Sequence, residues 1–179
     1  MPTTRRNRKV YRQGSKSHDS VIVALNGRFG DTSGAPYVEG RLIIPRLLIE
    51  TNISFLVDTG ADLTVLHPQD SVKMKLPFSE LTTNGTSDLL GVGANQQSYL
   101  VEPAIILFTE PEKRVFGYGV DLLICPFDQR AKNAKELLQL PSLLGRDILD
   151  NWDISYSKSM NKLEFSIVKY DFVRNLPKP

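Results

Sequence analysis

The sequence predicts an all-β fold in which short strands close into a barrel, with a helical insert and one short helix near the C-terminus. Segments rich in β-branched and apolar residues recur along the chain and are separated by Gly, Pro and Asn, which is typical of strands joined by turns. Many short strands with few helices indicate a closed, β-dominant domain. The chain has 179 residues, of which 41% are apolar and 23% charged, and this fits one soluble globular domain.

The first half of the chain alternates strand segments with turn chemistry. The elements expected there are a strand at Val21–Leu25 before the turn Asn26-Gly27, a loop over 30–36, a strand at Tyr37–Ile44 that Pro45 ends, a hairpin over 47–57 with its turn at Thr51-Asn52, a strand at Val65-Leu66 and a short helix at Gln69–Lys75.

The second half contains the longer strands and the helix formers. The elements expected there are a bent hairpin tip at Leu89–Gly93, strands at Ser98–Phe108 (interrupted by Pro103) and Val115–Cys125, a helix within 129–140, a short helix at Arg146–Trp152, and a hairpin pairing Ile154–Tyr156 with Lys162–Val168.

Charge divides the chain unevenly and supports a division into four parts. Residues 1–20 carry six basic side chains against Asp19, a net charge of +5, so the remaining residues carry −3 of the overall +2. We expect residues 1–19 to be a disordered basic tail, 20–35 an extension, 36–168 the folded domain and 169–179 a C-terminal tail. A solvated arm is the preferred interpretation of the basic tail. Nucleic-acid binding through the tail stays open, and none is expected elsewhere.

The composition argues against several classes of protein. One cysteine, Cys125, excludes an internal disulfide framework, and two histidines make a metal site improbable, so no metal or cofactor is expected. The longest apolar runs have five residues, far short of the roughly 20 needed to span a membrane. A secretory leader is not recognisable either, and we therefore expect no membrane contact and a cytoplasmic location.

The strongest chemical signal is the segment Asp58-Thr59-Gly60-Ala61, which follows the apolar residues 55–57. A rigid strand that ends in an acid holds a carboxylate in a fixed place, as a catalytic group requires. Gly60 allows another backbone to come close, and the Thr59 hydroxyl can form hydrogen bonds across that approach. The alternative is a structural turn aspartate that caps its own backbone.

A second signal lies 87 positions further on, where the apolar pair Leu143-Leu144 runs into Gly145-Arg146-Asp147. An arginine in the first turn of a helix suggests a specific acidic partner, and Asp62 is the natural candidate for a bidentate ion pair. Asp147, Asp150 and Asp153 are spaced three apart, and we expect them to form a solvated face.

Together these segments resemble the retropepsins, the retroviral-type aspartic proteases, over residues 36–168. The resemblance implies a closed barrel-like fold, with Asp58 as the catalytic aspartate and Thr59, Gly60 and Ala61 supporting the active-site loop. It also implies that Asp62 and Arg146 shape the substrate cleft, and that Gly91-Val92-Gly93 form the tip of a flap over the substrate.

Aspartic protease chemistry requires two carboxylates that share one proton, and this chain has one matching loop. Asp31-Thr32-Ser33-Gly34 is a near match without a preceding apolar strand. We therefore expect a homodimeric aspartic endopeptidase that cleaves extended peptide or protein substrates. A second interpretation is that the enzyme also processes its own N-terminus. The alternative is a non-catalytic dimerisation or peptide-binding module of the same fold.

Overall fold

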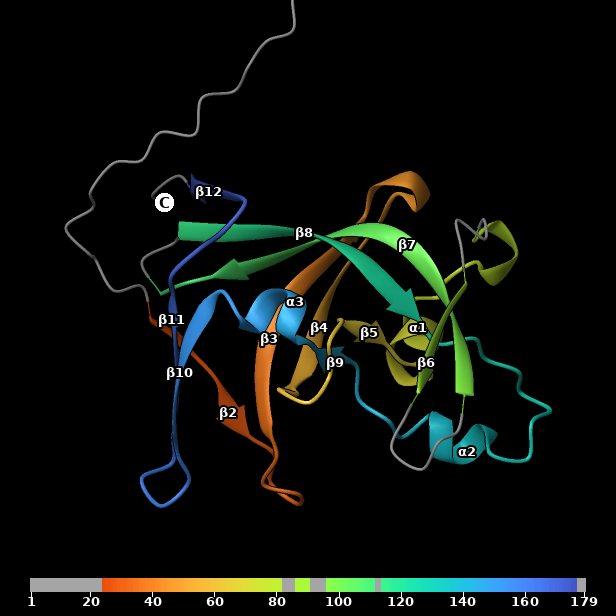
Figure 1. Cartoon of the computed structure of the whole chain (residues 1–179), viewed down its shortest axis with the longest axis horizontal. Helices are drawn as coiled ribbons and strands as arrows, with labels where there is room; N and C mark the ends of the chain where they lie inside the picture. Colours follow the sequence, from red (N-terminus) through yellow and green to blue (C-terminus); the bar gives the residue numbers. More distant parts are fainter. Residues whose placement is uncertain (1–23, 82–85, 91–95, 112–113, 177–179) are drawn as a thin grey trace, which may run out of the picture.

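The computed structural model describes residues 24–81, 86–90, 96–111 and 114–176 (Figure 1). The expected basic tail, most of the Val21–Leu25 strand and the Gly91-Val92-Gly93 tip lie outside the described residues.

Six strands form a closed barrel (Figure 1). Their hydrogen-bonded order is β8-β5-β9-β4-β3-β7, and a long antiparallel pairing of β7 with β8 closes the ring. The all-β barrel prediction is therefore confirmed. The strands are β3 (Pro36–Ile44), β4 (Ile49–Val57), β5 (Val65–Leu66), β7 (Gln96–Thr109), β8 (Arg114–Ile124) and β9 (Leu143–Leu144).

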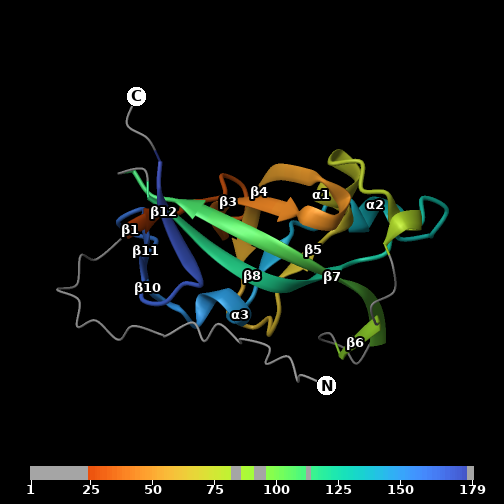
Figure 2. The same cartoon turned by 90° about the horizontal axis from the view of Figure 1, so that it is seen from above.

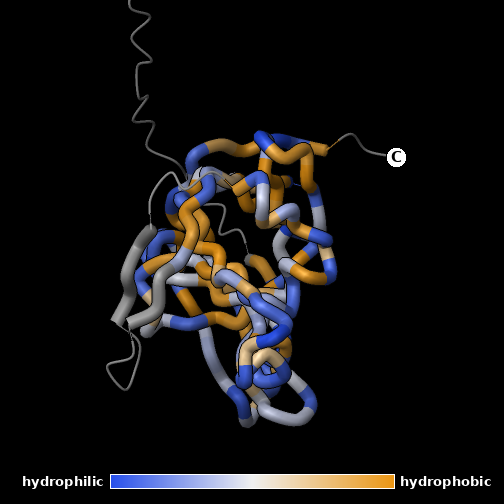
Figure 3. The backbone as a smooth tube through the Cα atoms, turned by 90° about the vertical axis from the view of Figure 1, so that its right-hand side faces the viewer, coloured by the Kyte–Doolittle hydropathy of each residue, from blue (hydrophilic) through white to orange (hydrophobic). Residues whose placement is uncertain are grey.

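The barrel encloses the hydrophobic core because its strands alternate between inward apolar and outward polar residues. In β3, Val38, Gly40 and Leu42 point inward, whereas Glu39 and Arg41 are exposed. Figure 3 shows the same mixture of apolar and polar residues along the tube. The largest fully buried side chains are Phe55, Phe108, Phe116, Phe165, Leu42, Ile44, Leu66, Ile106, Leu122, Leu123, Ile124 and Leu144.

The hairpin between β3 and β4 turns at 45–48, so the turn predicted at Thr51-Asn52 is wrong. A 3₁₀ turn, Pro45–Leu47, opens the bend, and Leu48 completes it with a φ of 53°. Thr51 and Asn52 lie inside β4, where Asn52 is paired with Arg41. Because the φ of proline is fixed, the turn begins at Pro45, six residues before the predicted start at Thr51.

A separate three-stranded sheet packs against one end of the barrel (Figure 2). Its order is β1 (Ala24–Asn26), β11 (Lys162–Ile167) and β10 (Trp152–Ser157), all antiparallel. The predicted terminal hairpin is therefore confirmed. Edge-to-face contacts of the Trp152 ring with Phe108 and Tyr118 join the small sheet to the barrel core.

Two further short strands lie at the barrel surface. β2 (Arg28–Phe29) pairs with β3, and β12 (Phe172–Asn175) adds to the edge of β8. The Phe172 ring covers Gly117, where any side chain would collide with it. Residues 169–179, expected as a tail, therefore include a paired strand.

The helices are short and lie outside the barrel. They are α1 (Pro68–Lys73), the 3₁₀ turn η2 (Phe78–Glu80), α2 (Ala134–Leu137) and α3 (Arg146–Leu149). The helix expected within 129–140 is reduced to the four residues of α2, because Asn133 provides no side-chain cap and Leu138 and Leu140 remain exposed. Among the described residues no helix is long and apolar enough to cross a membrane.

Candidate active site

Asp58 follows the last residue of β4, where that strand runs parallel to β9. Val57 is paired with Leu144, and the Asp58 N–H donates to the Leu144 carbonyl at 3.1 Å. The Gly60 N–H donates to Asp58 Oδ1 at 2.9 Å, which fixes the carboxylate above its own turn. The side chain is half-buried. The barrel therefore holds one oxygen of Asp58 by a backbone donor and presents the carboxyl group to the outside.

The loop after Asp58 is fastened to the segment that follows β9. The Arg146 N–H donates to the Ala61 carbonyl at 2.9 Å, and the Asp147 N–H donates to the Asp62 carbonyl at 3.1 Å. These two bonds hold the middle of the loop, while the bond of Asp58 to Leu144 holds its start. The two motifs singled out in the sequence are therefore in direct contact, although 87 residues separate Asp58 from Gly145.

Thr64 and Asp147 hold the far end of the loop. The Asp147 carboxylate accepts from the Thr64 N–H at 3.0 Å, from the Thr64 hydroxyl at 2.7 Å and from the Ile148 N–H at 3.0 Å. The Thr64 Oγ1 in turn accepts from the Gly145 N–H at 3.2 Å. Thr64 is fully buried, so these bonds are shielded from water.

Gly145 makes this contact sterically feasible. A Cβ atom at this position would lie 2.4 Å from the Leu63 carbonyl carbon and 2.8 Å from the Thr64 nitrogen. Both atoms belong to the backbone and cannot rotate away. The glycine is therefore required because two backbones meet at this point.

Asp62 and Arg146 form an ion pair through Asp62 Oδ1 and the Arg146 Nη2 group. The hydrogen bond to Asp62, reinforced by its charge, raises the pKa of Arg146. The two side chains are 70% and 50% exposed, so solvent screens the pair and its contribution to stability is small. The pair gives the loop that follows Asp58 a charged, solvent-exposed edge.

The remaining expected site residues divide into two groups. Thr59 and Gly60 are exposed next to Asp58. Gly91, Val92 and Gly93 lie outside the described residues; they follow β6 (Thr86–Leu90), in which Leu90 is paired with Gln96 of β7. In the described ranges no group of three or more metal-ligating side chains lies together.

Two residues that fasten the loop escaped the sequence interpretation. Asp147 was expected on a solvated face with Asp150 and Asp153. Those two residues are exposed, but the Asp147 carboxylate accepts hydrogen bonds from the N–H and hydroxyl groups of Thr64. Its place in the first turn of α3 was the available signal, because acids there accept backbone N–H groups. Thr64 gave no recognisable signal.

The closed barrel, with an aspartate loop fastened by a Gly-Arg-Asp segment, defines a retropepsin-like fold. The sequence matches no family model and no curated protein.

The solved structures that are similar to this chain include the following three. A retropepsin-like aspartic protease from Rickettsia conorii is 18% identical, with 87% of this chain and 95% of that chain covered and a TM-score of 0.46. EIAV protease in complex with the inhibitor HBY-793 is 18% identical, with 68% and 90% covered and a TM-score of 0.40. The retroviral protease-like domain of Ddi1 from Leishmania major is 14% identical, with 79% and 94% covered and a TM-score of 0.35.

Proposed function

We propose that this chain is an aspartic endopeptidase in which Asp58 is the catalytic residue and two copies of the chain complete one active site. The observation that carries the proposal is the placement of Asp58. Its carboxylate stands half-exposed at the end of a buried strand, held by the Gly60 N–H at 2.9 Å, on a loop fastened at both ends. A reactive carboxylate needs this combination of rigidity and access.

The chemistry explains why a second copy is proposed. One carboxylate must be ionised to take a proton from the attacking water, while a second must be protonated to donate to the carbonyl of the peptide bond. Two carboxylates that lie close together cannot both ionise, so they share the proton. A twofold axis beside the loop would bring Asp58 opposite its own copy.

Two other acids in the chain are poorer candidates for the second carboxylate. Asp62 is already engaged in an ion pair with Arg146, and its side chain is 70% exposed. Asp31, followed by Thr32, lies in a turn and lines a separate pocket with Arg28. Neither stands at the end of a buried strand.

The neighbouring residues take supporting roles in this proposal. Thr59, which is exposed, forms hydrogen bonds across the twofold axis, and the exposed backbone of Gly60 binds an extended peptide. Asp62 and Arg146 shape the cleft edge, and Gly91–Gly93 take the role of a flap over the substrate. Water is the nucleophile, so the reaction uses no metal, cofactor or covalent intermediate.

The test combines a digest with a mass measurement on the full chain. The wild-type protein and the Asp58→Asn variant are incubated with a peptide library at acidic and neutral pH, with and without pepstatin, and the native mass of each is measured. Asp153→Asn, an exposed acid on β10, serves as the control. We expect cleavage by wild type and control, none by Asp58→Asn, and a dimer for all three.

Two results would contradict the proposal. Cleavage by Asp58→Asn at the wild-type rate would remove Asp58 from the chemistry. A stable dimer that cleaves nothing at either pH, yet binds peptides, would favour the non-catalytic binding module. N-terminal sequencing of the purified wild type and of Asp58→Asn shows in addition whether the enzyme removes its own basic tail.

A further inference from the structure

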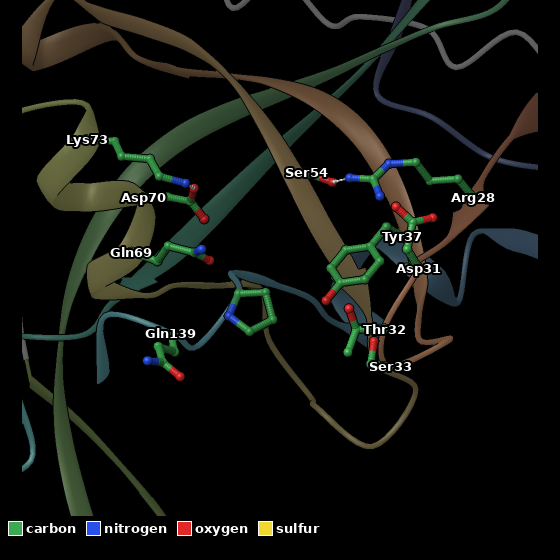
Figure 4. A pocket seen from close by; sticks show the side chains of 12 residues that line it. Arg28, Asp31, Thr32, Ser33, Tyr37, Ser54, Gln69, Asp70, Lys73 and Gln139 are labelled. Carbon is green, nitrogen blue, oxygen red and sulfur yellow. Dashed lines mark hydrogen bonds and ion pairs between the residues drawn. The ribbon is translucent and has the colours of Figure 1, made fainter. Parts of the chain in front are cut away.

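A polar pocket of about 410 Å³ lies beside the barrel and does not include Asp58 among its lining residues (Figure 4). One wall is formed by Arg28 of β2, Tyr37 of β3 and the turn that carries Asp31. The opposite wall is formed by α1, with Asp70 and Lys73, and by the end of the insert. In Figure 4 the side chains of the two walls face one another across the opening.

The pocket lies on the same face of the sheet as Asp58. Ser54 lines the pocket, and successive side chains of a strand alternate, so Ser54 and Asp58 share one face while Phe55 is fully buried on the other. Four residues of strand correspond to about 13 Å. An extended peptide at Asp58 that runs along this face would therefore bring a side chain about four residues from the cleaved bond to the pocket.

The charges in the pocket do not balance once existing ion pairs are counted. Arg28 donates to the Ser54 hydroxyl at 2.8 Å and lies 3.4 Å from Glu39, whose charge offsets its own. Lys73 lies 3.8 Å from Asp70. The lining itself contains two bases, Arg28 and Lys73, and two acids, Asp31 and Asp70, so the one net negative charge comes from Glu39, which is attached to Arg28 outside the lining.

Asp70 is held in place as a further acceptor. Its side chain is 13% exposed, and its Oδ2 accepts from the hydroxyl of the buried Ser142 at 2.7 Å. Its Oδ1 is 3.8 Å from the Nζ of Lys73, whose side chain is 67% exposed, and this distance is too long for a hydrogen bond. A second donor can therefore bind Oδ1 without breaking the bond to Ser142.

We propose that this pocket is a substrate subsite that binds a basic side chain, lysine or arginine, about four residues from the bond cleaved at Asp58. Asp31 on one wall and Asp70 on the other attract the ammonium or guanidinium group, and Gln69 and Tyr37 add polar groups to the lining. The inference rests on the proposed function for the position of the cleaved bond. The charge preference rests on the pocket alone.

The test uses decapeptides with one cleavable centre, in which lysine, leucine or glutamate is placed three, four or five residues from the bond on either side. Values of kcat/KM are compared for the wild type, Asp31→Asn, Asp70→Asn and the control Asp121→Asn, an exposed acid of β8 that does not line the pocket. We expect the wild type to prefer lysine over leucine by roughly three- to fivefold at one position. The ratio should fall toward one in Asp31→Asn and Asp70→Asn and stay unchanged in the control.

A binding measurement separates this inference from the proposed function. The same peptides are titrated into the full-length Asp58→Asn protein at low and high salt, and the affinities are read by fluorescence anisotropy. Preferential binding of the lysine peptides, weakened by salt and by Asp31→Asn, supports the subsite even if no variant cleaves. Equal affinity for lysine, leucine and glutamate peptides in a protein that cleaves them would overturn the subsite and leave the protease.

Discussion

The carboxylate of Asp147 binds both the backbone N–H and the hydroxyl of Thr64, 83 positions earlier in the chain, at 3.0 and 2.7 Å. These bonds join the end of the Asp58 loop to the start of α3. Since Asp58 is also bonded to Leu144, both ends of the loop depend on the same short segment. The orientation of Asp58 is therefore determined by residues far away in the sequence.

Replacing Asp147 by asparagine should disturb this arrangement without a change in size. An amide has one acceptor oxygen, so at least one of the three donors, the Thr64 N–H, the Thr64 hydroxyl or the Ile148 N–H, loses its partner. We expect Asp147→Asn to lower the free energy of unfolding by roughly 1–3 kcal/mol. If the chain is a protease, kcat should fall by roughly ten- to hundredfold while KM changes little, because the loop shifts.

The matched control is Asp153→Asn, which removes an exposed carboxylate on β10. Urea denaturation and peptide kinetics on both variants provide the comparison. Equal stability and equal kcat in the two variants would show that the Asp147 bonds do not position the loop.

Gly145→Ala should be more damaging than its size suggests. The added methyl group would lie 2.4 Å from the Leu63 carbonyl carbon, and neither backbone can move without breaking the bonds around Thr64. We expect a loss of roughly 1–3 kcal/mol or more in unfolding free energy. Gly119→Ala is the control, because a Cβ there would be 3.7 Å from its nearest neighbour, Asp171 Oδ2. Comparable urea midpoints for the two variants would contradict the close-approach argument.

Local patterns predicted the strands and the loop because the chemistry of each was visible within a few residues. The apolar run before Asp58 and the pair Leu143-Leu144 both became buried barrel strands. The contact of Asp62 with Arg146 was also foreseeable, since an arginine in a first helical turn needs an acidic partner. These features depend on residue type and immediate neighbours.

Features that depend on pairing partners could not be predicted in this way. Pro103 was expected to interrupt its strand, yet β7 continues through this residue. The strand tolerates the proline because β3 is paired with β7 only at 105–107, so the missing N–H of Pro103 removes no hydrogen bond to β3. The helix expected in 129–140 shrank to α2, because propensity alone does not stabilise a short helix without a buried face. Phe172 forms a strand because Gly117 leaves room for its ring.

Leu48 offers a site where stability can be increased. It adopts a φ of 53° at the turn between β3 and β4, and its side chain is 92% exposed. A non-glycine residue in the left-handed region costs about 1–2 kcal/mol, and no buried contact offsets that cost here. We expect Leu48→Gly to raise the free energy of unfolding by up to about 1 kcal/mol, because the greater freedom of glycine in the unfolded chain cancels part of the gain.

The control for this variant is Leu138→Gly, at an exposed position with ordinary right-handed helical backbone at the end of α2. Thermal melts should move in opposite directions for the two glycines. A lower melting temperature for Leu48→Gly would mean that the turn is not strained at this residue.

Tyr118 should make the fold sensitive to alkali. Burial raises its pKa to about 12, and its hydroxyl donates to the Lys169 carbonyl at 2.7 Å while accepting from the Trp152 indole N–H at 2.7 Å. An unfolded tyrosine ionises near pH 10, so between about pH 10 and 12 the unfolded chain has lost the proton and the folded chain has kept it. The free energy of unfolding should therefore fall as the pH rises through this window, and the contribution of Tyr118 should be complete below pH 10.

Tyr118→Phe removes the titrating group, and it also leaves the Trp152 N–H without this acceptor. Urea midpoints at pH 8, 10 and 11.5 should show a less stable variant at pH 8 and a gap that narrows with rising pH. A constant gap across the three values would show that Tyr118 does not titrate with folding.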